Sequence, residues 1–169
     1  MPAEYGIVTE IYAYVAFLVI LLTYGLETAF FRFSNNKEDV KVVYSTALIS
    51  LIISSCVFML LLLFASPSIA NLMGHGIESR FINWFAIIVG LDAVASISFA
   101  KLRKEERAIR FATIRILGII INITLNIYFI AYRSFGIEYI FISNLISSAF
   151  TLLLLFPEMT SSVFVFDRI

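Results

Sequence analysis

The sequence has little charge and few of the residues that build reactive sites. Charged side chains make up 14% of its 169 residues, and it contains one cysteine and one histidine. Because Cys56 has no partner, an intrachain disulfide is excluded, and we interpret this residue as a small core or lipid-facing side chain. His75 has no acidic or thiol neighbour at ligand spacing, so we expect no metal site and no cofactor. The zero net charge gives no reason to expect a nucleic-acid partner.

Enzyme signatures are missing as well. The sequence has no HExxH or GxSxG motif, no phosphate-binding glycine loop and no paired intramembrane aspartates. We therefore expect that the protein is not an enzyme.

Apolar residues dominate what remains. They make up 61% of the chain, whose mean hydropathy is +0.98. A soluble fold of this length could not bury so much apolar surface, so we predict an all-α polytopic membrane bundle that forms one domain over residues 1–169. Its five expected transmembrane spans are 6–31, 42–65, 82–100, 111–132 and 136–156. Ser66 as N-cap and Pro67 at the first helical position predict a short surface helix over 67–73.

The loops carry their cations on one side of this bundle. Segments 32–41 and 101–110 and the C-terminus hold nine lysines and arginines, whereas the loops on the other side hold two. The positive-inside rule therefore predicts that the first group is cytoplasmic and that the N-terminus lies outside. Residues MPAEYG show neither a basic n-region nor an upstream span, so we expect that a preceding helix is missing and that the chain is a fragment.

Several polar residues lie inside the predicted spans, where a charge near the centre costs about 2.5–3.5 kcal/mol. Asp92 lies near the middle of its span and shares a face with Ser96. Arg115, Asn122 and Asn126 fall within about 40° of one another on the next span. The last span carries a stripe made of Asn144, Ser147, Ser148 and Thr151. Three helices with polar stripes indicate a polar space between them, and its candidate transport-path residues are Glu27, Asp92, Arg115, Asn122 and Asn126.

Each of these residues also has a structural interpretation. Asn and Ser stripes often serve only as hydrogen bonds between membrane helices. Arg115 is five residues past the basic loop and could extend its side chain back to the headgroups. Asp92 is too short and too central to do so, which favours a functional role.

Glu27 is a carboxylate near the end of the first span, where it requires either water or a partner. Arg32 is five residues further on, outside the spacing of an intrahelical ion pair. Arg115 is expected at a similar depth, so we predict that Glu27 and Arg115 approach each other across the cytoplasmic half of the bundle as a gate. The alternative is that Glu27 reaches interfacial water beside the FRFSNN turn.

The basic loop KLRKEERAIR allows two interpretations. Clusters of cations beside a span can bind anionic lipid headgroups. The loop also contains Glu105 and Glu106, however, and its cations are of the kind that fix topology. We favour the topological interpretation and count membrane lipids among the expected partners.

Two stretches resemble a known family. Pro2 to Gly6 open the first span, and Gly25, Ala29, Arg32 and Phe33 close it, in a pattern similar to the second helix of Wzx-type polysaccharide-biosynthesis flippases. LRKEERAIRFATIRILGIIINITLNIYFI is similar to the basic loop and fifth helix of that family. These flippases belong to the superfamily that also holds the MATE drug exporters and the lipid II flippase. The resemblance consists of turns and apolar blocks along nearly the whole chain.

The resemblance implies that the chain corresponds to helices two to six of a MATE-like N-terminal half. The whole protein would move a lipid-linked oligosaccharide, expected to be an undecaprenyl-diphosphate sugar unit, across the bacterial inner membrane. Arg115 would hold the diphosphate, and Asp92 or Glu27 would couple transport to protons or sodium. The remainder of the same transporter is then a further expected partner.

Two alternatives stay open at this point. A MATE-like drug exporter would bind cations and should have an acidic cavity. A non-transporting helical subunit that scaffolds a membrane assembly would need no cavity. A reading frame with an upstream helix and further apolar spans would favour a transporter over the scaffold.

Overall fold

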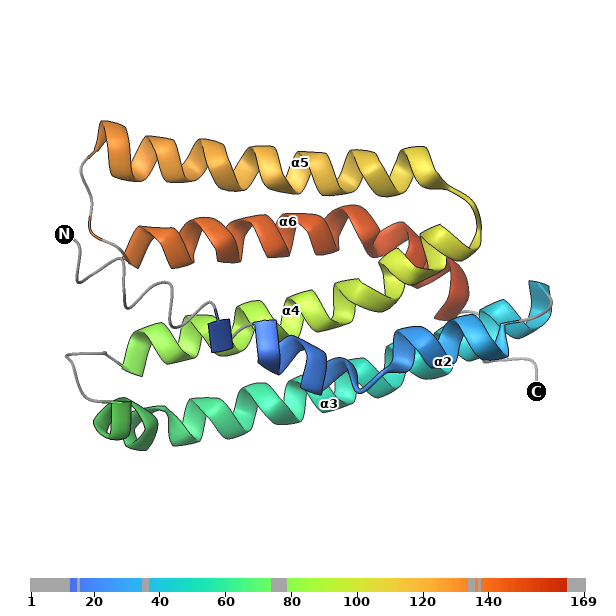
Figure 1. Ribbon diagram of the computed structural model, residues 1–169, viewed down its shortest axis with the longest axis horizontal. Helices are drawn as coiled ribbons and strands as arrows, with labels where there is room; N and C mark the ends of the chain where they lie inside the picture. The colour runs from blue at the N-terminus through green and yellow to red at the C-terminus, as the bar shows by residue number, and fades with distance from the viewer. Residues whose placement is uncertain are drawn as a thin grey trace.

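The computed structural model describes residues 13–14, 16–34, 37–73, 79–133, 136 and 138–163. Every regular element in these ranges is a helix, in the order Ala16–Thr23, α2 (Leu26–Phe33), α3 (Lys37–Met73), α4 (Ser79–Lys104), α5 (Ala108–Asn126), η1 (Ile127–Tyr132) and α6 (Glu138–Val163). The long helices run roughly side by side along one axis (Figure 1). The turn at Pro2–Gly6, the loop at 74–78 and the end at 164–169 lie outside the described residues.

The prediction of an all-α membrane bundle is confirmed. The helices α3, α4, α5 with the start of η1, and α6 are each long and apolar enough to cross a membrane, and Ala16–Thr23 with α2 can form a fifth, bent span. The end of α2, the start of α3, the α4–α5 connection and the end of α6 lie at one end of the bundle (Figure 1). We call this the basic end, because it groups the cation-rich segments as the sequence predicts.

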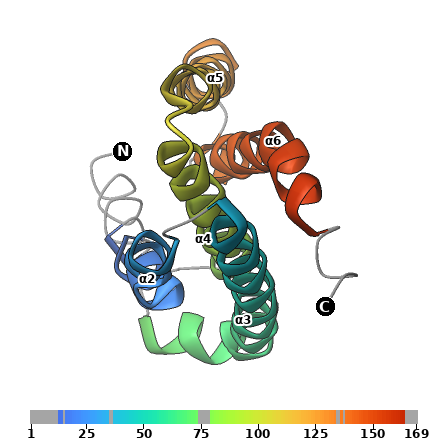
Figure 2. The same ribbon diagram turned by 90° about the vertical axis from the view of Figure 1, so that its right-hand side faces the viewer.

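α4 is the central helix. It lies between α2 and α3 on one side and α5 and α6 on the other (Figure 2). In its most apolar stretch 78% of the residues are buried, against 11% in the corresponding stretch of α5. Both helices have similar hydropathy, so the difference follows from position. α4 forms the core with its neighbours, whereas α5 turns most of its surface outward.

The first span is broken, contrary to the expectation of one continuous helix over 6–31. Tyr24 and Gly25 both have left-handed backbone conformations, with φ of 33° and 73°, and the helices on either side are bent by 41°. Gly25 adopts this conformation without a steric penalty, which Tyr24 cannot. The Tyr24 hydroxyl is hydrogen-bonded to Ser50 of α3 at 2.5 Å. Phe30, fully buried against Tyr44 and Leu48, fixes α2 on the core.

The prediction that Ser66 starts a separate surface helix at Pro67 is wrong, because α3 continues through Pro67 to Met73. Proline cannot donate the hydrogen bond that the Leu63 carbonyl would accept in a regular helix. The Ser66 hydroxyl donates to that carbonyl instead, at 3.0 Å. Figure 2 shows the last turns of α3, in green, bent away from the rest of the helix. A proline kink therefore replaces the expected N-cap.

The remaining spans extend beyond their predicted bounds. α4 covers 79–104 rather than 82–100, and α6 continues through Pro157 to Val163 rather than ending at 156. The predicted span 111–132 is α5, which begins at Ala108, followed by the π-helical segment η1. The extra turn of α6 brings Glu158 inside the bundle, which matters for the site.

Candidate functional site

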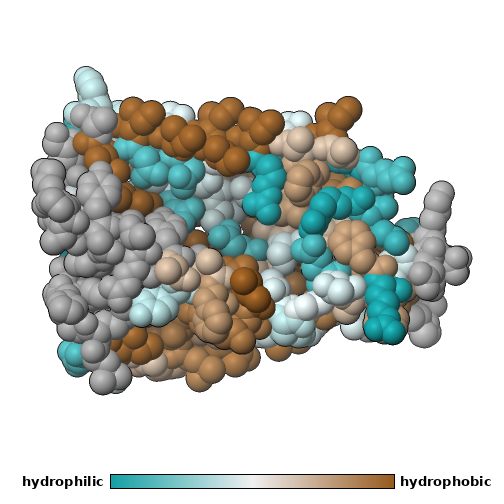
Figure 3. Space-filling model, viewed as in Figure 1, coloured by the Kyte–Doolittle hydropathy of each residue, from teal (hydrophilic) through white to brown (hydrophobic). Residues whose placement is uncertain are grey.

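A polar cavity of about 660 Å³ opens between α4, α5, α6 and the helix Ala16–Thr23. Four of the five predicted site residues line it: Asp92, Arg115, Asn122 and Asn126. Ser96 and the α6 stripe of Asn144, Ser147, Ser148 and Thr151 line it too. In Figure 3 hydrophilic side chains cross the middle of this face between two hydrophobic bands. The structure thus brings the three polar stripes to one place.

The α5 and α6 walls are joined by amide and hydroxyl groups. Asn126 Nδ2 donates to Asn122 Oδ1 at 3.0 Å, and Asn122 Nδ2 donates to Asn144 Oδ1 at 3.4 Å. The Ser147 hydroxyl donates to the Gly118 carbonyl at 2.7 Å. Asn126 Oδ1 is buried and accepts no hydrogen bond from any described residue. The stripes therefore form hydrogen bonds between the helices, which is the structural interpretation given above. They also leave one acceptor, Asn126 Oδ1, available at the cavity wall.

The two charged residues of the cavity wall come from facing helices. Asp92, on α4, lies near Ser148 on α6 and Arg115 on α5, and both side chains act on its carboxylate. The Arg115 guanidinium lies 4.2 Å from the centre of the Phe99 ring. Phe99 and Arg115 are each eight residues from Arg107 at the α4–α5 connection, so they lie at the same depth. Arg115 is therefore directed across the bundle to α4 rather than back to the loop.

Glu27 does not line this cavity, and the predicted pairing with Arg115 is wrong. Its carboxylate contacts Arg103 at 2.7 Å, while the two side chains are 42% and 41% exposed. The reason is the packing of the helices, because α2 contacts α3 and α4 whereas α5 packs mainly on α6. A cation at the end of α4 is thus within reach of Glu27. The expectation that its partner lies on another helix is confirmed.

Arg103 connects Glu27 to the cavity through aromatic rings. Its guanidinium lies between Phe31 of α2 and Phe111 of α5, at 5.7 and 5.8 Å from the ring centres. Phe111 packs edge-on against Phe99 at 5.4 Å, and Phe99 carries Arg115 on its face. A pair of phenylalanines, Phe111 and Phe99, therefore lies between Arg103 at the basic end and Arg115 at the cavity. Each cation–π contact at such an exposed site is worth about 0.5–1 kcal/mol.

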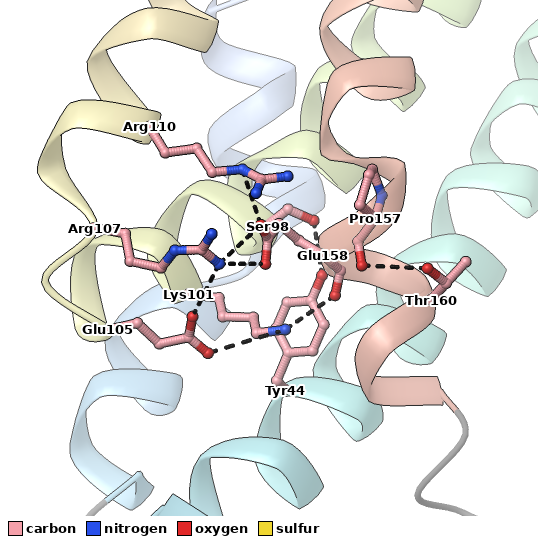
Figure 4. A network of polar contacts seen from close by, with 9 residues as sticks. All are labelled: Tyr44, Ser98, Lys101, Glu105, Arg107, Arg110, Pro157, Glu158 and Thr160. Atoms are coloured by element: carbon pink, nitrogen blue, oxygen red, sulfur yellow. Dashed lines mark hydrogen bonds and ion pairs between the residues drawn. The ribbon is translucent and has the colours of Figure 1, made fainter.

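A second polar cluster, at the basic end, was missed by sequence reasoning (Figure 4). Glu158 is 4% exposed and accepts hydrogen bonds from Arg107 at 3.0 and 3.1 Å, while Arg110 Nε lies 3.0 Å from one of its oxygens. Buried Lys101 donates to the Glu158 carbonyl at 2.9 Å and lies 4.6 Å from the centre of the Tyr44 ring. The Tyr44 hydroxyl is hydrogen-bonded to Ser98 at 2.9 Å.

This Glu158 cluster connects α3, α4, α5 and α6 through the carboxylate and the backbone carbonyl of one residue. In the sequence, Glu158 is the second residue after the predicted span 136–156 and follows Pro157, so no local pattern marks it as part of a helix. The available signal was the number of cations in 101–110, since closely spaced cations beside an apolar bundle favour an anion among them.

Over the ranges that the structure describes, no group of three or more histidine, cysteine or acidic side chains could hold a metal ion. The cavity is therefore characterised by one carboxylate, one guanidinium and several amides and hydroxyls. Such a set can bind a phosphorylated, hydroxyl-rich molecule through charge-assisted and neutral hydrogen bonds.

Comparison with known proteins gives the family. The model of the polysaccharide biosynthesis protein family matches residues 1–164, and the chain belongs to that family. No curated protein and no solved structure matches it. Membership together with the apolar helices indicates a multi-pass membrane protein with a role in polysaccharide synthesis or export.

Proposed function

We propose that this member of the polysaccharide biosynthesis family is part of a flippase that moves a lipid-linked oligosaccharide across the bacterial inner membrane. The observation that carries the proposal is that Asp92, Arg115, Asn122 and Asn126 line the same cavity. Its volume of about 660 Å³ falls in the range of small-molecule sites. In the proposed orientation the basic end is cytoplasmic, as the cation count favours.

The chemistry of the wall suits a diphosphate-sugar headgroup. The planar guanidinium of Arg115 can grip two phosphate oxygens at once. Asn126 Oδ1 can accept a hydrogen bond from a sugar hydroxyl, because no described residue occupies it. Asp92 lies on the facing helix as the carboxylate available for coupling to a proton or sodium. In this proposal Arg115 binds the charge of the cargo, the amides bind its sugar, and Asp92 senses the ion.

The arginine–phenylalanine series supplies a path to this site. Arg103 lies one turn beyond Phe99 on α4 and is held by Glu27 across the bent first span. A phosphate that displaced Glu27 from Arg103 would be one aromatic pair away from Arg115. Glu27 thus keeps the role of a gate residue in the proposal, with Arg103 in place of Arg115 as its partner.

The drug-exporter alternative receives less support. A cavity for cationic drugs should carry an excess of carboxylates, whereas the described lining holds one carboxylate and one guanidinium. The scaffold alternative gives no reason for a polar cavity inside apolar helices, where polar groups are costly.

Complementation of a flippase-deficient strain by the complete encoded protein tests the proposal. Asp92→Ala and Arg115→Ala should each abolish export, while the amount of protein in the membrane stays near normal. Arg115→Lys should retain part of the activity, because it keeps the charge and loses the bidentate grip. Arg32→Ala removes an exposed cation of α2 that does not line the cavity, and it should leave export unchanged. Full export by both cavity variants would contradict the proposal.

A further inference from the structure

We propose that a second groove, at the basic end, binds a phospholipid whose headgroup carries both a phosphate and a primary ammonium group, as phosphatidylethanolamine does. The groove has a volume of about 560 Å³ and runs along the start of α5 beside Leu154 of α6. Thr113 and Leu117 line it, two residues before Arg115 and Ile119 of the cavity wall. A step of two residues is about 200° around a helix, so the groove lies on the other side of α5.

The groove has a charged rim and an apolar wall. Glu106, Arg107 and Arg110 lie at the rim, and Ile109, Ile114, Leu117 and Leu154 supply the wall. Ile109, in the first turn of the candidate membrane span α5, is 86% exposed. A phospholipid at the membrane boundary has the same order of groups, with a polar head followed by an acyl chain.

The guanidinium groups keep donors available for a phosphate. Arg107 donates to Glu158 from Nη1, the atom that also approaches Glu105, and Arg110 approaches Glu158 with Nε. Among the residues that the structure describes, the remaining nitrogens of these two side chains donate no hydrogen bond. Glu158 fixes the position of both arginines without using their full capacity. Two guanidinium groups with free N–H donors form a standard phosphate site.

The charge balance favours a zwitterion over an anion. Arg107 and Arg110 face the carboxylates of Glu158 and Glu106, while Lys101 and Glu105 lie 4.0 Å apart and compensate each other. The charged residues of the groove lining and their buried partner Glu158 therefore sum to zero, and an anionic headgroup would add an uncompensated charge to this set. Glu106 forms no ion pair with any described residue. Its carboxylate is available to an ammonium group beside the phosphate.

The backbone at Glu106 supports a role for its side chain. Glu106 has a φ of 56°, a left-handed conformation that favours glycine. It ends α4 in a Schellman arrangement, in which Arg107 N donates to the Leu102 carbonyl at 2.9 Å and Glu106 N donates to the Arg103 carbonyl at 3.2 Å. Glycine is the usual residue at this position, so a glutamate there costs stability without improving the turn. A carboxylate that binds the headgroup would account for it.

Native mass spectrometry of the purified protein, titrated with lipids of identical acyl chains, tests the inference. Phosphatidylethanolamine should bind about tenfold more tightly than phosphatidylcholine, which has no N–H donor for Glu106, and more tightly than anionic phosphatidylglycerol. Glu106→Gly should remove this preference and leave the thermal stability equal or higher. Tighter binding of phosphatidylglycerol, or an unchanged preference in Glu106→Gly, would overturn the inference.

Two further variants separate the groove from general electrostatics. Thr113→Trp fills the groove without changing a charge and should reduce binding of all three lipids at least threefold. Lys104→Gln removes a cation of the same turn that does not line the groove, and it should change nothing. Free phosphoethanolamine at millimolar concentration should not displace the lipid, because it lacks the acyl chain. Equal losses in Lys104→Gln and Thr113→Trp, or displacement by phosphoethanolamine, would contradict a lipid groove.

Discussion

The cavity and the Glu158 cluster use the same residue types in opposite ways. In the cluster, two arginines converge on one buried carboxylate at 3.0–3.1 Å. In the cavity, Arg115 rests on an aromatic ring and forms no ion pair with any residue that the structure describes. A buried charge with saturated partners holds helices in place, because separating it leaves a charge unpaired. A guanidinium on a ring can exchange its partner at little cost. The first arrangement therefore suits helix assembly, and the second suits the binding proposed for the cavity.

The strongest test of this comparison removes the carboxylate of the cluster. Glu158→Gln should lower the free energy of unfolding by about 2–4 kcal/mol, because the buried carboxylate loses its charge-assisted contacts with Arg107 and Arg110. Thermal unfolding of the purified protein in detergent measures the effect. Glu105→Gln is the matched control, since this exposed side chain contacts its cations only at 3.7 and 4.0 Å. Equal losses in the two variants would show that the cluster has no special structural role.

An intermediate effect is expected where α5 meets α6 beside the cavity. A Cβ atom on Gly118 would lie 2.7 Å from Thr151 Oγ1. Gly118→Ala should therefore lower the free energy of unfolding by about 1–3 kcal/mol, and adding Thr151→Ala should restore most of the loss.

Gly90→Ala is the control for this variant. Its Cβ would meet the Met59 sulfur at 2.9 Å, at the flexible end of a long side chain that can move away. A failure of Thr151→Ala to rescue Gly118→Ala would show that the contact is looser than the structure indicates. The contact between α5 and α6 would then depend on the Glu158 cluster rather than on the cavity wall.

The smallest effect is expected for Glu27 and Arg103, whose ion pair shares one property with the Glu158 cluster and lacks another. Their contact is as short as those of the cluster, yet both side chains are about two-fifths exposed. A double-mutant cycle on unfolding with Glu27→Gln and Arg103→Gln should give a coupling of about 1 kcal/mol or less. A coupling as large as the effect of Glu158→Gln would place this pair with the structural cluster and remove its role as a gate.

The sequence predicted the cavity better than it predicted the ion pairs. Asp92, Arg115, Asn122 and Asn126 were found because helical periodicity places each stripe on one face, and polar faces avoid lipid. The partner of Glu27 was mistaken because depth in the membrane was known but lateral position was not. Arg103 and Arg115 are both compatible with its depth, and only the packing of α2 on α4 selects Arg103.

The predicted helix boundaries were wrong where the local start and stop signals of a helix and the hydropathy of the segment indicate different structures. Pro67 reads as a helix start, yet Ser66 replaces the missing donor and α3 continues. At Gly25 the error was the reverse. The apolar run predicted one continuous helix, whereas the helix breaks at Tyr24 and Gly25, which both have left-handed backbone conformations. Hydropathy measures whether a segment enters lipid and carries little information on how its backbone bends inside.

The central position of α4 has a consequence for the order in which the chain is inserted. Ribosomes deliver α4 to the membrane before α5 and α6, which later cover it. During that interval Asp92 has neither Ser148 nor Arg115 nearby, and its insertion carries a penalty of about 2.5–3.5 kcal/mol. The apolar residues around Asp92 must offset this penalty alone, since most of them later leave the lipid for the core of the bundle. The hydropathy of α4 thus reflects an early stage of biogenesis. At that stage α4 is exposed to lipid, and it becomes the core of the bundle only later.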